Sequence, residues 1–478
     1  MTSKYLLIIL SLLALVSCKS TQTQVKSGTI KPPAQFAGDH TYANDSVLHW
    51  KSFFKDERLL AWLDSGLRNN QDVKQTFARI SLASADVKLA RGNFLPQLNL
   101  TTAVGMQRFG DYTVDGVGNF DTNLSDNITP DRRIPEHIPD LSVGFQAQWE
   151  ADIWGKLKNR KKAAVARYLS STQAWNDSRL LLLYNIAERY YQLQTLDYKL
   201  KVTKENELLQ VRALELIRAQ KQAGVVTELA VKQFEAQTLN TKALAFNLQR
   251  EIRQVEYEFN LLTGTMPEPV ERTSLSITDQ FLKVNTLITP DQILKIRPDV
   301  RQAEWEIAGA GADVAAARAA FYPSLNFNAT PGLHTFRSSV WFQFPISLAY
   351  WFGGSLATPL LQRNALKAEL SAAKTKESIS ILKYESTIIK AIGEVQLFLD
   401  TRAMVANSFS LKNEEVNALN SGLSASRDLF IAGMATYLEV ITAQKSVLEA
   451  QLDLADINLL QTKNELNLYR SLGFGNIR

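Results

Sequence analysis

The chain has 478 residues, of which 45% are hydrophobic and 21% are charged, and its formal net charge is +5. This length allows large cores or several domains, and this composition excludes a chain that is disordered throughout. One cysteine excludes an intrachain disulfide, and the four histidines lie in no metal-ligand spacing, so neither a metal site nor a cofactor is predicted.

The chain also lacks the motifs of the familiar enzyme and nucleic-acid-binding classes. GxxxxGK[ST], HExxH and GxSxG are all missing from the sequence, which weighs against an enzyme without excluding one. The basic run 156–162 is short, and we interpret it as the solvated start of a helix rather than as a nucleic-acid site.

The N-terminus has the pattern of an export and anchoring signal. Lys4 precedes an apolar stretch over residues 5–16, which is too short for a membrane span and typical of a secretory signal, so residues 1–17 are predicted to be a signal peptide. Leu15-Val16-Ser17-Cys18 resembles the bacterial lipobox, which predicts lipidation of Cys18 and anchoring to a membrane. The alternative is an ordinary signal with an unrelated cysteine. Residues 18–55 are predicted to form a lipidated tether.

An internal duplication is predicted from two matching stretches, ADVKLARGNFLPQLNL at 85–100 and GADVAAARAAFYPSLNF at 311–327. Each is an unbroken helical sequence that passes into a strand pattern at a proline. The matches at a constant offset of 227 pair Asp86 with Asp313, Arg91 with Arg318, Phe94 with Phe321, Pro96 with Pro323, Leu98 with Leu325 and Asn99 with Asn326. Six matches in register favour a repeat.

Four strands are predicted, at about 96–106, 141–150, 323–331 and 339–349, because apolar and polar residues alternate there. A soluble sandwich gives the same alternation, but strands of about 9–11 residues suit a tilted membrane crossing. The stretches 105–140 and 331–338 are predicted to be outer loops.

Two long helical hairpins are predicted, over 156–263 and 360–470. Residues 156–222 contain neither proline nor glycine and allow one helix of about 100 Å. In the return helix the apolar positions follow steps of 3 and 4, with Thr238 and Thr241 filling two of them, which is the seam of a coiled coil. The two hairpin turns match at an offset of 209, where Gly433 corresponds to Gly224 and Thr436 to Thr227.

The predicted fold class is therefore a mixed α and β membrane protein, with a first repeat at 56–264, a connector at 265–296 and a second repeat at 297–478. Four strands cannot close a barrel, and lipid does not tolerate open sheet edges. Copies of the chain must pool their strands. Three copies give twelve transmembrane β-strands, with twelve long helices as a hollow α-helical cylinder, and two copies give eight strands.

Arg297-Pro298-Asp299-Val300 and the later Phe321-Tyr322-Pro323 resemble the signature of the TolC-type outer membrane factor family, and most closely its NodT-type lipoproteins of RND efflux systems. The resemblance covers nearly the whole mature chain. It implies a homotrimer with a twelve-stranded barrel in the outer membrane lipid and a periplasmic helical tunnel. It also implies a periplasmic adaptor and an inner-membrane RND pump as partners. The chain would then be a passive exit duct for drugs or metals, without catalytic residues.

By this resemblance the two hairpin turns contact the adaptor, through Gly224, Val225, Val226, Thr227 and Glu228 in the first and Gly433, Met434, Ala435, Thr436 and Tyr437 in the second. Plain helix capping is the alternative role for them. Arg427 and Asp428 are candidates for a charged aperture, and Gln146, Gln148, Asn326 and Gln343 for a lumen lining. A type I secretion duct and a surface coiled-coil scaffold lipoprotein remain alternative functions.

Overall fold

The structure, a computed structural model, describes residues 30–38, 49–275, 282–284 and 287–474. Cys18 and the predicted signal peptide lie outside these residues. The chain divides into one unit at Met1–Lys31 and another at Pro32–Arg478, and the helices and strands described below belong to the second unit. None of the helices in the described ranges combines the length and the apolar character that a membrane crossing requires.

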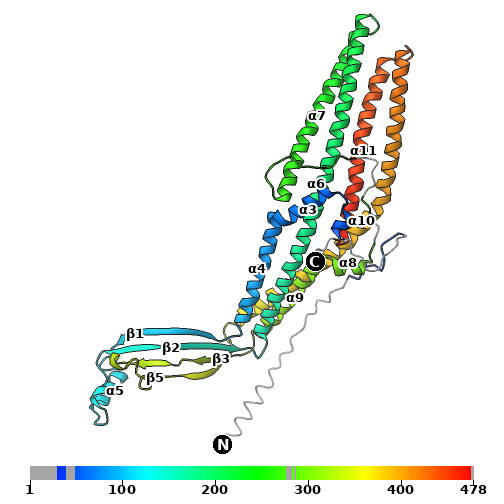
Figure 1. Cartoon of the computed structure of the whole chain (residues 1–478). Helices are drawn as coiled ribbons and strands as arrows, with labels where there is room; N and C mark the ends of the chain where they lie inside the picture. The colour runs from blue at the N-terminus through cyan, green and yellow to red at the C-terminus, as the bar shows by residue number, and fades with distance from the viewer. Residues whose placement is uncertain (1–29, 39–48, 276–281, 285–286, 475–478) are drawn as a thin grey trace. The chain divides into compact units, whose positions relative to one another are not determined.

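The order of elements repeats, which confirms the predicted duplication and the mixed α and β class (Figure 1). Each half has a helix, strands, a long helix, a turn and a second long helix. The helices of the first half are α2 (Trp50–Phe53), α3 (Glu57–Asn69), α4 (Gln71–Gly92), α5 (Val114–Leu124), α6 (Lys156–Gln222) and α7 (Glu228–Thr263). Those of the second half are α8 (Pro290–Ile296), α9 (Pro298–Ala319), α10 (Arg363–Ile431) and α11 (Tyr437–Ser471).

The coiled-coil seam predicted for the return helix is the buried face of α7. Nine of its buried side chains form a row at steps of 3 and 4: Val231, Phe234, Thr238, Thr241, Ala245, Leu248, Ile252, Val255 and Phe259. α7 packs along α6, and α11 packs along α10. The long helices are thus stabilised by an apolar stripe rather than by intrinsic propensity.

Polar residues interrupt this seam between two apolar clusters. Thr203 and Gln210 of α6 and Thr241 of α7 are at most 1% exposed. Among the residues that the structure describes, the Gln210 amide and the two threonine hydroxyls have no hydrogen-bond partner. The second hairpin carries Leu419 and Ala450 at the positions equivalent to Gln210 and Thr241 (210 + 209 = 419 and 241 + 209 = 450), and both belong to an apolar cluster with Val416 and Leu454.

We therefore expect the double substitution Q210L/T241A, which copies the second hairpin, to stabilise the fold by about 1–3 kcal/mol, because it removes buried polar groups without partners. The reverse exchange L419Q/A450T should destabilise it by a similar amount. Thermal unfolding of the detergent-extracted protein, followed by circular dichroism, measures both. A lower unfolding midpoint for Q210L/T241A would contradict the inference that these buried polar groups destabilise the fold.

The sheet has six segments that form four antiparallel strands: β1 (Gln97–Gln107), β2 (Ile138–Ala151), β3 (Ser324–Ala329) with β4 (Gly332–Thr335), and β5 (Leu348–Ala349) with β6 (Phe352–Ala357). β1 pairs with β2, and β2 pairs with β3 and β4 in one register, with Ala147 opposite Ala329 and Gly144 opposite Gly332. Pro331 divides β3 from β4 because it has no N–H, but its carbonyl still accepts a bond of 2.9 Å from the Phe145 N–H.

The fourth strand was predicted in the wrong place, at 339–349. The structure has a 3₁₀ turn at Ser338–Val340 there and places the strand at 348–357, where β6 pairs with β3 and β5 with β4. Pro345 lacks the N–H of a regular ladder and lies in the middle of the predicted segment. With the strand at 348–357, α10 begins 207 residues after α6 (363 − 156 = 207), which is close to the distance of 209 residues between Gly224 and Gly433 of the two hairpin turns.

The outer loops also differ from prediction. The first contains a helix, α5 (Val114–Leu124), and a 3₁₀ turn, η1 (Pro130–Arg132), and it begins only after β1 ends at Gln107. The second was predicted from Pro331, but β4 continues the strand to Thr335. Gln343, predicted to line the lumen from the fourth strand, therefore lies in the outer loop instead.

Part of the predicted tether is docked on the body. Phe36 is buried in the main core, and the backbone of Ala37 exchanges hydrogen bonds of 2.9 and 3.2 Å with the side chain of Gln396 on α10. Trp50 and Phe53 of α2 are buried as well. Residues 32–38 and 50–54 of the predicted tether therefore pack on the body, because aromatic side chains there find apolar partners.

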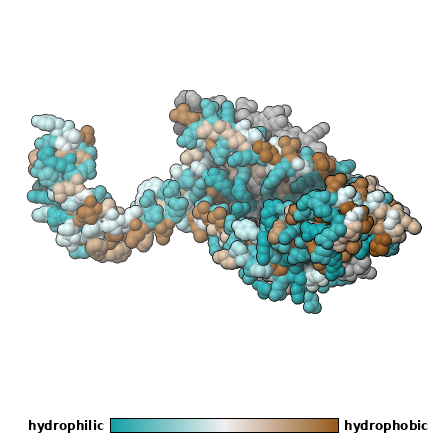
Figure 2. Space-filling view, turned by 90° about the horizontal axis from the view of Figure 1, so that it is seen from above, coloured by the Kyte–Doolittle hydropathy of each residue, from teal (hydrophilic) through white to brown (hydrophobic). Residues whose placement is uncertain are grey.

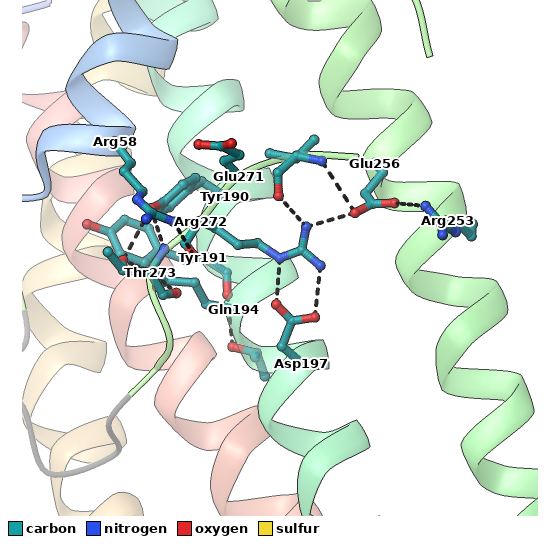
Figure 3. A network of polar contacts seen from close by, with 12 residues as sticks. Arg58, Tyr190, Tyr191, Gln194, Asp197, Arg253, Glu256, Glu271, Arg272 and Thr273 are labelled. Atoms are coloured by element: carbon teal, nitrogen blue, oxygen red, sulfur yellow. Dashed lines mark hydrogen bonds and ion pairs between the residues drawn. The ribbon is translucent and has the colours of Figure 1, made fainter. Parts of the chain in front are cut away.

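The connector between the repeats is bound across α3, α6 and α7 by polar contacts (Figure 3). Arg272 donates to both carboxylate oxygens of Asp197 at 2.5 and 2.8 Å and to Glu256 at 2.8 Å. Thr273 contacts Asp56 and receives hydrogen bonds from Gln194. Burial acts to raise the pKa of Asp56, but hydrogen bonds from Thr273, Tyr190 and the backbone outweigh it and lower the pKa.

Candidate functional site

The sheet has one apolar and one polar face. Residues directly opposite in an antiparallel pair share a face, so the register assigns every position. The apolar face carries Leu98, Leu100, Val104 and Met106 of β1, Val143, Phe145, Ala147 and Trp149 of β2, and Phe327, Leu333, Phe352 and Leu356 of the later strands. The polar face carries Asn99, Gln146, Gln148, Glu150, Asn326, Asn328, His334 and Ser355.

The apolar face is not covered by the rest of the described chain. Leu100 is 67% exposed and Val104 is 71% exposed, and every residue of β1 is exposed. In Figure 2 the sheet is the curved arm at the left, and hydrophobic residues gather on its outer side. A soluble sheet buries its apolar face against another layer, so this sheet is built to contact an apolar partner outside the chain.

Aromatic side chains are fixed where the sheet joins the helices. The Trp149 indole N–H donates to the Phe94 carbonyl at 2.9 Å, and the Trp154 indole N–H donates to the Pro323 carbonyl at 2.8 Å. Trp149 stacks on Phe327, and Trp154 stacks on Tyr322. Tryptophan and tyrosine in this arrangement are typical of the boundary between apolar and aqueous surroundings.

The two hairpin turns have the same backbone geometry. Gly224 and Gly433 have φ values of 74° and 73°, a region that favours glycine. The N–H of the residue after each glycine, Val225 or Met434, reaches back five residues to a carbonyl, at 2.9 and 2.8 Å. These are Schellman caps, and they turn the side chains of Val225 and Met434 outward, where they are 70% and 79% exposed.

The turns differ in how the second helix begins. Thr436 forms a capping box with Glu439, whereas Thr227 makes no side-chain cap. In the first turn Lys221 and Glu228 form an ion pair of 2.7 Å instead. The equivalent residues of the second turn are Phe430 and Tyr437, which pack against the apolar cluster of the first hairpin. The two hairpin ends lie beside each other (Figure 1).

The aperture candidates Arg427 and Asp428 lie in the last two turns of α10, and both are exposed. Within the described ranges neither makes an ion pair, and Asp428 contributes only its carbonyl to the Ala432 N–H. The structure thus brings them to the hairpin end of the molecule and leaves their side chains directed to the surroundings.

Arg297, Pro298 and Asp299 of the signature have structural roles. Arg297 is 6% exposed and donates to both oxygens of Asp299 at 3.0 and 2.7 Å and to Glu394 of α10 at 3.0 Å. It also donates to the Ser471 carbonyl at the end of α11, at 2.9 Å. Pro298 occupies the first turn of α9, where its missing N–H costs nothing. Arg297 therefore joins three helices at the start of the second repeat.

A long α-helical hairpin body, duplicated, with a two-faced sheet at one end, defines a class of outer-membrane ducts, and the comparisons agree. The model of the outer membrane efflux protein family matches residues 62–265 and 289–474. The cation efflux system protein CusC of Escherichia coli K12 is 28% identical over 428 residues, covering 89% of this chain and 88% of CusC. The probable outer membrane lipoprotein SilC of Salmonella typhimurium is 25% identical and covers 98% of both chains. A crystal structure of CusC matches with a TM-score of 0.80 at 25% identity, over 92% of this chain and 96% of that one.

The chain belongs to the outer membrane efflux protein family. It is an outer-membrane component of an efflux system, and it works as a transport duct rather than as an enzyme.

Proposed function

We propose that three copies of this chain form a passive exit duct for small molecules, either drugs or metal ions. The two-faced sheet carries this proposal. Its exposed apolar face fits lipid and its polar face fits a water-filled lumen, but its edge strands β1 and β6 would be unpaired in lipid. Pairing of β1 of one copy with the β5–β6 edge of the next removes every edge, and three copies supply the twelve strands of a common bacterial barrel.

In this assembly the hairpin turns contact a periplasmic adaptor, and an inner-membrane RND pump supplies the energy. The name of CusC places that relative in a cation efflux system, which supports metal ions among the cargoes of this chain. Lipidation at Cys18 adds a second anchor beside the barrel, and the relative SilC is named a probable outer membrane lipoprotein. Arg427 and Asp428, one turn before the second hairpin turn, would form the charged aperture.

The test is the oligomeric mass of the detergent-extracted protein together with single-channel conductance in a planar bilayer. We expect a trimer that conducts, and a monomer without conductance would overturn the proposal. Cys18→Ala separates it from the scaffold alternative, because a scaffold held only by its lipid becomes soluble whereas a barrel remains in the membrane. Export of a protein substrate rather than of small molecules would favour the type I secretion duct.

For the hairpin turns we expect V225D/M434D to weaken adaptor binding more than tenfold. Both side chains are exposed at the tips, and their N–H groups keep the Schellman bonds whatever the side chain, so the fold is retained while a charge is placed in an apolar contact. Site-specific cross-linking to the adaptor measures this. Lys204→Asp, also exposed but far along α6, is the control. Equal cross-linking by both variants would contradict the assignment.

A further inference from the structure

Three lysines, at positions 158, 161 and 162, lie together near the start of α6. Lys158 and Lys162 are exposed and Lys161 is half-buried. In the ranges that the structure describes, none of the three forms an ion pair, whereas the neighbouring Lys156 pairs with Glu150 at 2.5 Å. The first turn of α6 holds no acidic residue. Cations at a helix N-terminus are repelled by the helix dipole, so local helix stability does not explain them.

Two backbone donors at this helix start are already satisfied. The carboxylate of Asp152 accepts hydrogen bonds from the N–H groups of Leu157 and Lys158, at 2.9 and 2.7 Å. These two N–H groups of the first turn therefore already have a partner in the Asp152 carboxylate. The positive charge that remains is that of the lysine side chains.

A series of contacts links one of these cations, Lys161, to the apolar face of the sheet. Trp149 lies on that face, and its indole N–H donates to the Phe94 carbonyl at 2.9 Å. The Lys161 ammonium lies 5.8 Å from the centroid of the Phe94 ring. An apolar face, an aromatic layer and a group of cations therefore follow one another along the molecule. This order matches a bilayer surface, from acyl chains through the interface to the headgroups.

We propose that Lys158, Lys161 and Lys162 bind the phosphate of an anionic phospholipid headgroup at the periplasmic surface of the outer membrane. The inference rests on the proposed function, in which the apolar face of the sheet contacts lipid. The occupant is a lipid because the cations continue that apolar surface, and it is anionic because the three ammonium groups have no counter-charge in the described chain. Zwitterionic lipid offers no net charge to balance them.

Native mass spectrometry of the full chain, released from detergent with added phosphatidylglycerol or phosphatidylcholine, tests the proposal. We expect the unaltered protein to retain phosphatidylglycerol preferentially and K158Q/K161Q/K162Q to retain at least fivefold less, with phosphatidylcholine unchanged. K158R/K161R/K162R should keep the preference. K201Q/K204Q/R212Q, which removes three exposed cations farther along the same helix, should keep it as well.

Equal phosphatidylglycerol retention by the glutamine variant and the unaltered protein would overturn the site. Displacement of the lipid by millimolar inorganic phosphate would also overturn it, because it would show a site for free anions. Conductance of the same preparations separates the two proposals. A conducting trimer without lipid preference refutes the headgroup site alone, whereas a protein that neither assembles nor conducts refutes the duct itself.

Discussion

Replacement of Arg297 by methionine should destabilise the folded chain by about 3–5 kcal/mol, the range for breaking a buried ion pair from one side. Methionine fills much of the volume but removes every donor. Asp299 and Glu394 would then be left as poorly compensated carboxylates, and the Ser471 carbonyl would lose its partner. A cost of this size exceeds a third of the stability of many domains, so we expect little assembled protein in the outer membrane.

Lysine should not rescue this position. Arg297 donates to partners on α9, α10 and α11 at once, and a single ammonium cannot reproduce the planar fork that makes the paired bonds to Asp299. Arg301→Met is the matched control, because Arg301 pairs with Glu304 within one helix at a partly exposed position, and we expect a change below about 1 kcal/mol. Urea unfolding of the purified protein measures all three variants. Equal midpoints for the substitutions at 297 and 301 would refute the role of Arg297 in joining the three helices.

The same contact has a defined pH dependence. Burial acts to raise the pKa of Asp299, but the hydrogen bonds and charge of Arg297 outweigh burial and lower the pKa below its ordinary value. The ionised carboxylate therefore stabilises the fold fully above the ordinary aspartate pKa of about 3.9, and this contribution is lost as the pH falls through the lower value of the folded state. Arg297→Met should lose this part of the acid sensitivity.

The helices could be predicted from the sequence because their signals are local. A stretch without proline or glycine defines α6, and the stripe that packs α7 is written in its own residues at steps of 3 and 4. The turns were predicted from glycines at equivalent positions, and both have the positive φ that glycine favours. Because the sequence is duplicated, each element of the repeat occurs twice, and the two occurrences support each other's prediction.

The fourth strand could not be placed because pairing is not local. Val340, Phe342 and Phe344 alternate with polar residues as a strand does, but they lie in the outer loop. The true strand contains Gly353 and Gly354, which hide its alternation, and its position is decided by the bonds that β3 offers. The partners of Arg297 were hidden for the same reason, since Glu394 lies 97 residues away and Ser471 lies 174 residues away.

An arginine at Leu100 should prevent stable insertion of the sheet. Leu100 lies on the exposed apolar face of β1, opposite Phe145. Arginine near the midplane of a lipid-facing strand costs about 2–4 kcal/mol, and a trimer carries the cost three times. We expect the fraction of chain recovered as trimer from outer membranes to fall at least tenfold.

Asn99→Arg is the control, because it places the same charge on the other face of the same strand. Asn99 is the adjacent residue of the same strand and is exposed too, but its side chain lies on the polar face, opposite Gln146. In a water-filled lumen an added arginine is solvated, so assembly should be kept while conductance and ion selectivity shift toward anions. If the two faces bordered the same medium, as in a scaffold whose sheet lies in the periplasm, the two arginines would behave alike. The difference between two neighbouring positions therefore reports directly which side of the sheet is in contact with lipid.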